Sequence, residues 1–102
     1  MKIIEMLCDY IEEELCDAKK YAVKALEVKN EYPGMAETFN RLSAEEMTHM
    51  QLLHNEVENV IVNYRREHGE PPVEMLAVYD YLHKKYIEKA KEVRQYQSMF
   101  RE

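Results

Sequence analysis

Residues 33–72 read PGMAETFNRLSAEEMTHMQLLHNEVENVIVNYRREHGEPP, and all five glycine and proline residues of the chain lie at the two ends of this segment. One group is Pro33-Gly34 and the other is Gly69-Glu70-Pro71-Pro72. Because these residues interrupt helices, they divide the chain into three stretches of about thirty residues each. The pattern predicts an all-α protein with three long helices at about 2–30, 33–68 and 72–100, each roughly 45 Å long.

The connections between the predicted helices are short, so consecutive helices are expected to be antiparallel. Pro33 suits the first turn of the second helix, where its missing N–H costs nothing, and Asn30 suits the position just beyond the first helix. The 102 residues contain no internal repeat and no linker. Residues 1–102 are therefore expected to form a single domain, a helical hairpin followed by a third helix.

The charge and cysteine content exclude several classes of function. Fourteen Lys and Arg against twenty Asp and Glu give a net charge of −6 without a basic block, which argues against nucleic acid as a partner. Acidic residues interrupt the apolar positions of the N-terminal stretch, so we expect no membrane span or signal peptide and a cytoplasmic protein. Cys8 and Cys16 are too few for a disulfide framework and are expected to be small buried thiols kept reduced.

In each of the three segments, apolar residues recur every three or four positions, as in helices that pack together, and each such set of positions forms a series. Glu14 is the only charge in the first series. Glu46 and His49 are the only members of the second that charge near neutral pH, and the third has none. The series are Ile4, Leu7, Ile11, Glu14, Ala18, Tyr21, Ala25 and Val28; Phe39, Leu42, Glu46, His49, Leu53, Val57, Val60 and Tyr64; and Met75, Tyr79, Leu82, Tyr86, Ala90, Val93 and Phe100.

The ionisable members of these series suggest a metal site. A carboxylate in a bundle core needs a positive partner, and the series contain no Lys or Arg. Glu46 and His49 are one helical turn apart on one face. Measured along the helix axes from the connection between the first and second helices, Glu14 lies at roughly 22 Å, and Glu46 and His49 lie at roughly 20 and 24 Å. The three side chains are therefore expected at the same height. We therefore predict Glu14, Glu46 and His49 as the ligands of a metal ion.

Other motifs carry weaker signals. His54 and Glu58 have metal-binding spacing, but they face away from the apolar series and are expected to form an exposed pair. Asp80 and His83 lie at the border of the third series, where they could form an accessory site. Tyr21 follows Glu14 on the same face and could donate a hydrogen bond to the site or act as a redox-active phenol, although simple aromatic packing is favoured.

The chain from Glu14 through Tyr21 to Leu42-Ser43-Ala44-Glu45-Glu46-Met47-Thr48-His49 resembles the first helix pair of ferritin-like di-iron proteins, especially rubrerythrins and encapsulated ferritins. The resemblance covers roughly residues 10–55. It implies that Glu14, Glu46 and His49 bind iron, with Glu46 as the bridging ligand. It also implies oxidation of Fe(II) by oxygen or peroxide, for iron storage or peroxide removal.

A complete site of this family takes a glutamate from each of two helices and a Glu-x-x-His from each of two others, and this chain offers one of each. A two-fold dimer would complete a four-helix core around two metal ions, which is how encapsulated ferritin subunits share their half-sites. We therefore expect a homo-oligomer, at least a dimer, that could assemble further into a ring or lie within a protein shell. The ligands suit iron, and manganese or zinc also fit.

Two alternatives remain open at this stage. A metal ion, zinc above all, could clamp the dimer without catalysis. A helical adaptor or structural protein could instead keep a ferritin-like scaffold without metal, with Glu14 and His49 bonded to each other. The expected enzyme is a ferroxidase or peroxidase-type oxidoreductase, and each alternative predicts a different response to added Fe(II).

Overall fold

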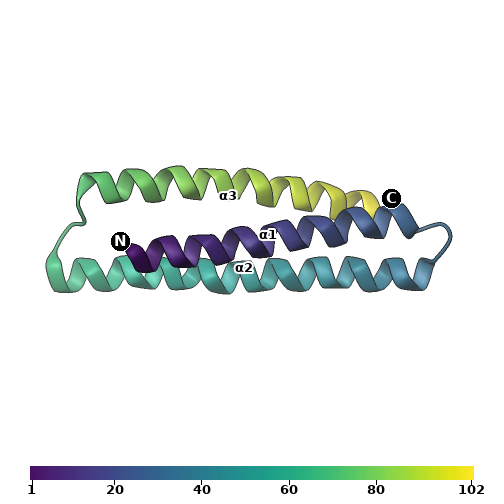
Figure 1. Cartoon of the computed structure of the whole chain (residues 1–102), viewed down its shortest axis with the longest axis horizontal. Helices are drawn as coiled ribbons and strands as arrows, with labels where there is room; N and C mark the ends of the chain where they lie inside the picture. The colour runs from purple at the N-terminus through teal and green to yellow at the C-terminus, as the bar shows by residue number, and fades with distance from the viewer.

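The computed structural model describes residues 1–102 as three helices without any strand. Helix α1 spans Lys2–Val28, α2 spans Pro33–His68 and α3 spans Val73–Phe100. They run up, down and up along a rod of 56 × 19 × 18 Å (Figure 1). The predicted all-α arrangement is confirmed, except that α1 ends two residues earlier and α3 begins one residue later than expected. None of the helices combines the length and the apolar content needed to cross a membrane.

The two groups of helix breakers form the two connections. Tyr32 adopts φ −134° and ψ 69° because the following proline disfavours a helical conformation, and its N–H donates to the Val28 carbonyl at 2.8 Å. At the other end of α2, Gly69 has φ 80°, a conformation that favours glycine. The Gly69 N–H donates to the Arg65 carbonyl at 3.0 Å. Pro33 therefore begins α2 and Gly69 ends it, as the sequence predicts.

Helix α1 is the central helix of the rod. It packs against both α2 and α3, whereas α2 and α3 scarcely touch each other. Consequently α1 has a second buried row, Cys8, Leu15 and Ala22, that the predicted series did not include. Ion pairs also join α1 to α3. In one of them, Lys19 Nζ lies 2.7 Å from a carboxylate oxygen of Glu92 on α3.

The packed row of α2 differs from the predicted series. Its buried residues are Ala36, Ser43, Met50, Val57 and Ile61, of which only Val57 belonged to that series. The small residues of this row admit α1 closely, and the Ser43 hydroxyl donates to the Ala18 carbonyl at 2.7 Å. The apolar spacing of the sequence predicted that the adjacent, more apolar row would be buried, because spacing carries no information about this hydrogen bond.

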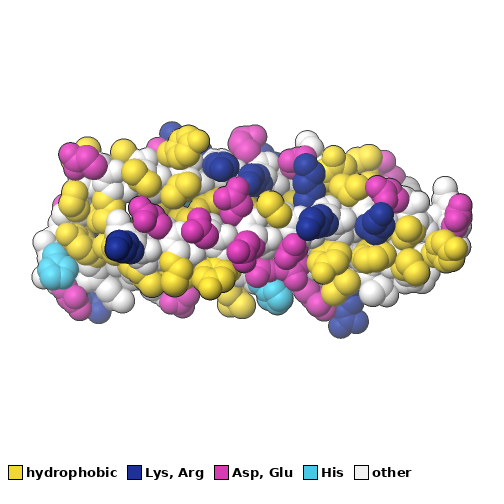
Figure 2. Space-filling view, in the orientation of Figure 1, with side chains coloured by type: hydrophobic (Ala, Val, Ile, Leu, Met, Phe, Trp, Pro, Cys, Tyr) yellow, Lys and Arg dark blue, Asp and Glu magenta, His cyan; other side chains and the backbone are white.

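The predicted α2 series therefore lies along an open flank between α1 and α2. Its members apart from Val57 are half-buried or, in the case of His49, exposed. In Figure 2 acidic side chains gather over the middle of this face, and hydrophobic side chains line α2 on either side of them. This apolar surface remains uncovered within one chain, and the predicted ligands lie in its middle.

The two thiols have different environments. Cys8 is buried between α1 and α3, and this burial raises the pKa of its thiol. Cys16 is exposed. The expectation of two buried thiols is wrong for Cys16, because the side of α1 that carries it lies beyond the edge of α3.

Candidate metal centre

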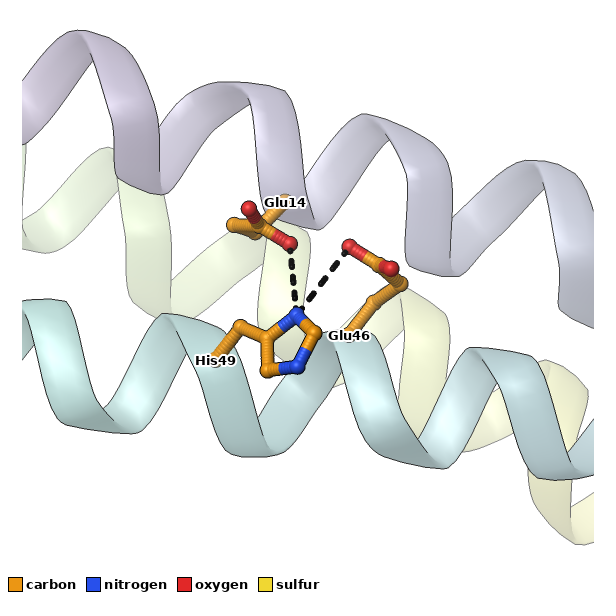
Figure 3. Close-up of side chains that lie close together, drawn as sticks. All are labelled: Glu14, Glu46 and His49. Carbon is orange, nitrogen blue, oxygen red and sulfur yellow. Dashed lines mark hydrogen bonds and ion pairs between the residues drawn. The ribbon is translucent and has the colours of Figure 1, made fainter.

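Glu14 of α1 and Glu46 and His49 of α2 come together in the middle of the rod (Figure 3). One ligand atom from each side chain lies within 4.8 Å of the other two. His49 Nδ1 is 3.4 Å from Glu14 Oε2 and 3.8 Å from Glu46 Oε2. The prediction that these three side chains are level is confirmed.

Local sequence explains how the three side chains converge. Glu46 and His49 are one turn apart, so both project from the same side of α2. On α1, Glu14 lies between the fully buried residues Ile11 and Ala18 and is thereby held at the edge that faces α2. The site thus depends on the packing of this helix pair and on no loop.

The cluster is shallower than the sequence suggested. The side chains of Glu14 and Glu46 are 24% and 18% exposed, whereas that of His49 is 53% exposed. Within a single chain the cluster is therefore not enclosed in a core. One side of the cluster opens directly onto the flank between α1 and α2, because the packed row of α2 is turned away from it.

No lysine or arginine pairs with the two glutamates of the cluster. Their only ion-pair partner is His49. A hydrogen bond between the Glu14 and Glu46 carboxyl groups, together with burial and repulsion by Glu14, raises the pKa of Glu46 to about 7. At pH 7 the Glu46 carboxyl group is therefore about half protonated, in the place where a metal ion would put its positive charge.

This environment makes the stability of the metal-free chain depend on Glu46. Between the ordinary pKa of 4.5 and about 7, the folded chain retains a proton that the unfolded chain has released. The free energy of unfolding should therefore fall as the pH rises through this window. Because Glu46→Gln is neutral at every pH, it should remove this fall, which denaturant titrations at about pH 5 and about pH 8 would measure.

The matched control is Glu45→Gln, next in sequence. Glu45 is half-exposed and pairs with Arg41 at 3.2 Å, so its variant should keep the pH profile of the parent. Identical profiles for the parent and Glu46→Gln would contradict the raised pKa of Glu46.

The donor set of the cluster fits a divalent transition metal. Two carboxylates and one imidazole are ligands that suit Fe(II), Mn(II) and Zn(II). The carboxylates lack a compensating cation, and the exposed side leaves room for further ligands. The chain can therefore hold one such ion with Glu14, Glu46 and His49.

Tyr21 packs against an aromatic neighbour close to the cluster. Its ring stacks on that of Phe39, with centroids 6.1 Å apart and an interplanar angle of 23°. This contact between α1 and α2 favours the packing role that the sequence analysis preferred for Tyr21.

The weaker motifs rearrange in the structure. Asp80 is exposed and pairs with Lys84 at 3.0 Å, so it does not join His83 in an accessory site. His54 was expected at the surface with Glu58, yet its side chain is only 18% exposed. The Nε2 atom of His54 lies 3.3 Å from Nδ1 of His83. No pattern in the sequence predicts this contact, because the two residues lie on different helices, 29 positions apart.

Comparison with known proteins gives no assignment for the chain. No protein-family model, no curated protein and no solved structure matches it. Its function is therefore inferred from the donor atoms, exposure and charge of the cluster.

Proposed function

We propose that the chain is a ferritin-like di-iron protein whose metal centre forms between two copies and oxidises Fe(II) with dioxygen or peroxide. The observation that carries the proposal is the Glu14, Glu46 and His49 cluster, with three ligand atoms within 4.8 Å of one another. The carboxylates have no lysine or arginine partner, as expected for residues that bind a cation. The resemblance of residues 10–55 to rubrerythrins and encapsulated ferritins supports the same function.

The surface around the cluster supports a shared site. Exposed apolar residues extend along α1 toward its N-terminus, and half-buried ones extend along α2 on both sides of the ligands. On α1 they are Ile3, Met6 and Tyr10, and on α2 they are Leu42, Leu53, Val60 and Tyr64. A second copy related by a two-fold axis would cover this flank, place two clusters opposite each other and complete a four-helix core from α1 and α2 of both chains.

Each ligand would contribute a different property to the site. The carboxylates of Glu14 and Glu46 would neutralise the charge of the bound ions, and Glu46 would release its proton when metal binds. His49 would supply a neutral imidazole nitrogen as the third donor. When bound, two Fe(II) ions supply the two electrons that, with two protons, convert one hydrogen peroxide into two waters.

An anaerobic titration with Fe(II), followed by admission of air, tests the function. We expect saturation near one iron per chain and rapid oxidation once air enters, followed by the absorbance of Fe(III). Tight binding of Fe(II) without oxidation would overturn the enzymatic function and favour a dimer that is held together by a non-catalytic metal ion. Absence of binding would overturn both metal-dependent functions.

The metal-free alternative has one observation in its favour. His49 Nδ1 lies 3.4 Å from Glu14 Oε2, so these two side chains can pair without an ion. That pairing leaves Glu46, whose only ion-pair partner is the same histidine at 3.8 Å, without a cation of its own. The metal-binding function accounts for all three side chains and is preferred for that reason.

A further inference from the structure

Two histidines, from the middle of α2 and the middle of α3, make one of the two side-chain hydrogen bonds between these helices, and the other joins Gln97 to Ser43. His54 Nε2 and His83 Nδ1 are 3.3 Å apart, and the ring centroids are 5.1 Å apart. This contact lies where α2 and α3 otherwise scarcely touch. It involves neither Glu14, Glu46 nor His49, so the proposed iron centre does not account for it.

We propose that His54 and His83 form a second metal site, which takes a borderline transition-metal ion such as Zn²⁺ or Cu²⁺. Two nitrogens bound to one tetrahedral ion at about 2.0–2.1 Å lie roughly 3.3 Å apart, which is the spacing observed between these nitrogens. Imidazole ligands suit Zn²⁺ and Cu²⁺ better than the harder ions that carboxylates favour. The two sites therefore differ in their preferred metals.

Neighbouring side chains orient the two rings. Glu58 Oε1 lies 3.7 Å from Nδ1 of His54, the nitrogen that faces away from His83. A carboxylate at that nitrogen favours the tautomer with hydrogen on Nδ1, which leaves the Nε2 lone pair free to bind a metal. The Tyr79 ring stacks on His83 with centroids 5.6 Å apart and fixes its plane. The stacking of His54 on His83 and of His83 on Tyr79 holds both rings in position before an ion arrives.

The histidines are reached through a cavity of about 160 Å³ between α2 and α3, which gives waters room to fill the remaining coordination positions. Lys91 and Arg94 line the same cavity. Their backbone positions lie roughly 12 and 16 Å beyond that of His83 along α3. Their long side chains carry positive charge into the cavity, so they oppose a cation at the histidines, and the two imidazole nitrogens must offset that repulsion.

An ion at this site would add a direct link between two helices that are otherwise joined mainly through α1 and by the hydrogen bond from Gln97 to Ser43. A ligand that binds only the folded chain raises its stability in proportion to the logarithm of its concentration. The second site would therefore act as a cross-link between α2 and α3, on the side of α2 away from the α1–α2 flank.

Isothermal titration with Zn²⁺ tests the site in a chain that lacks the first centre. The parent for this experiment carries Glu46→Ala, which removes the first site, and Cys16→Ser, which removes the exposed thiol. We expect one Zn²⁺ per chain, and His54→Gln or His83→Gln should each weaken binding by at least about tenfold, as loss of a ligand costs more than loss of its hydrogen-bond partner. His68→Gln is the control, because His68 is exposed at the end of α2 and should leave binding unchanged.

Electron paramagnetic resonance with Cu²⁺ gives a second measurement that does not depend on affinity. Two bound imidazoles should produce hyperfine splitting from two nitrogens, and either single variant should reduce this pattern to one nitrogen. Circular dichroism of the metal-free variants checks that the helices are retained. Zn²⁺ binding that is absent from the parent, or that is equal in the parent and both variants, would leave only a hydrogen bond between the rings and overturn the proposal, without bearing on iron oxidation.

Discussion

Glu46→Ala is expected to abolish Fe(II) binding and the oxidation that follows, whereas Glu45→Ala should leave both unchanged. The two residues are adjacent on α2, yet Glu46 belongs to the cluster and Glu45 is half-exposed and paired with Arg41. Loss of Glu46 leaves Glu14 and His49, two donors that already contact each other at 3.4 Å. Anaerobic binding of Fe(II), measured as iron retained per chain after gel filtration, gives the comparison directly.

The matched pair separates loss of a ligand from loss of negative charge. Both substitutions remove one carboxylate from the same turn of α2 and change the net charge equally. If iron were attracted only by the acidic surface, the two variants would lose binding to the same small extent. Retention of stoichiometric iron by Glu46→Ala would remove the cluster as the binding site and would end the proposed function.

Tyr10→Asp is expected to weaken the proposed dimer and to abolish oxidation in the same step. Tyr10 is 49% exposed on α1, one turn before Glu14, and would be covered by the second copy. A two-fold interface would bury the new carboxylate twice, and unpaired buried charges are strongly unfavourable. Light scattering should therefore show at least about a tenfold weaker dimer, since each 1.4 kcal/mol changes a dissociation constant tenfold.

Tyr81→Asp is the matched control for assembly. Tyr81 is 67% exposed on α3 and lies outside the proposed contact, so the same substitution should preserve both the dimer and its activity. Circular dichroism should show native helix content for both variants, because neither tyrosine belongs to the buried core. A parent chain that remains monomeric with and without metal would exclude the shared centre.

The sequence by itself determined the features that depend on neighbouring residues. The glycine and proline groups fixed the two connections, because Pro33 and Gly69 act on their own backbone and on the residue beside them. The convergence of Glu14, Glu46 and His49 also followed from the sequence, since a constant rise per residue and a short turn put the three at one level. Helical geometry is therefore sufficient to predict that these three side chains meet.

The tertiary structure alone decided how each helix is turned about its own axis. Two neighbouring rows of α2 could pack against α1, and the choice of the row with Ser43 depended on a hydrogen bond to Ala18 on the other helix. That choice left His49 more than half-exposed on an open flank and turned His54 toward His83. Sequence periodicity identifies the apolar rows of a helix, but contacts between residues far apart in the chain select which row is buried.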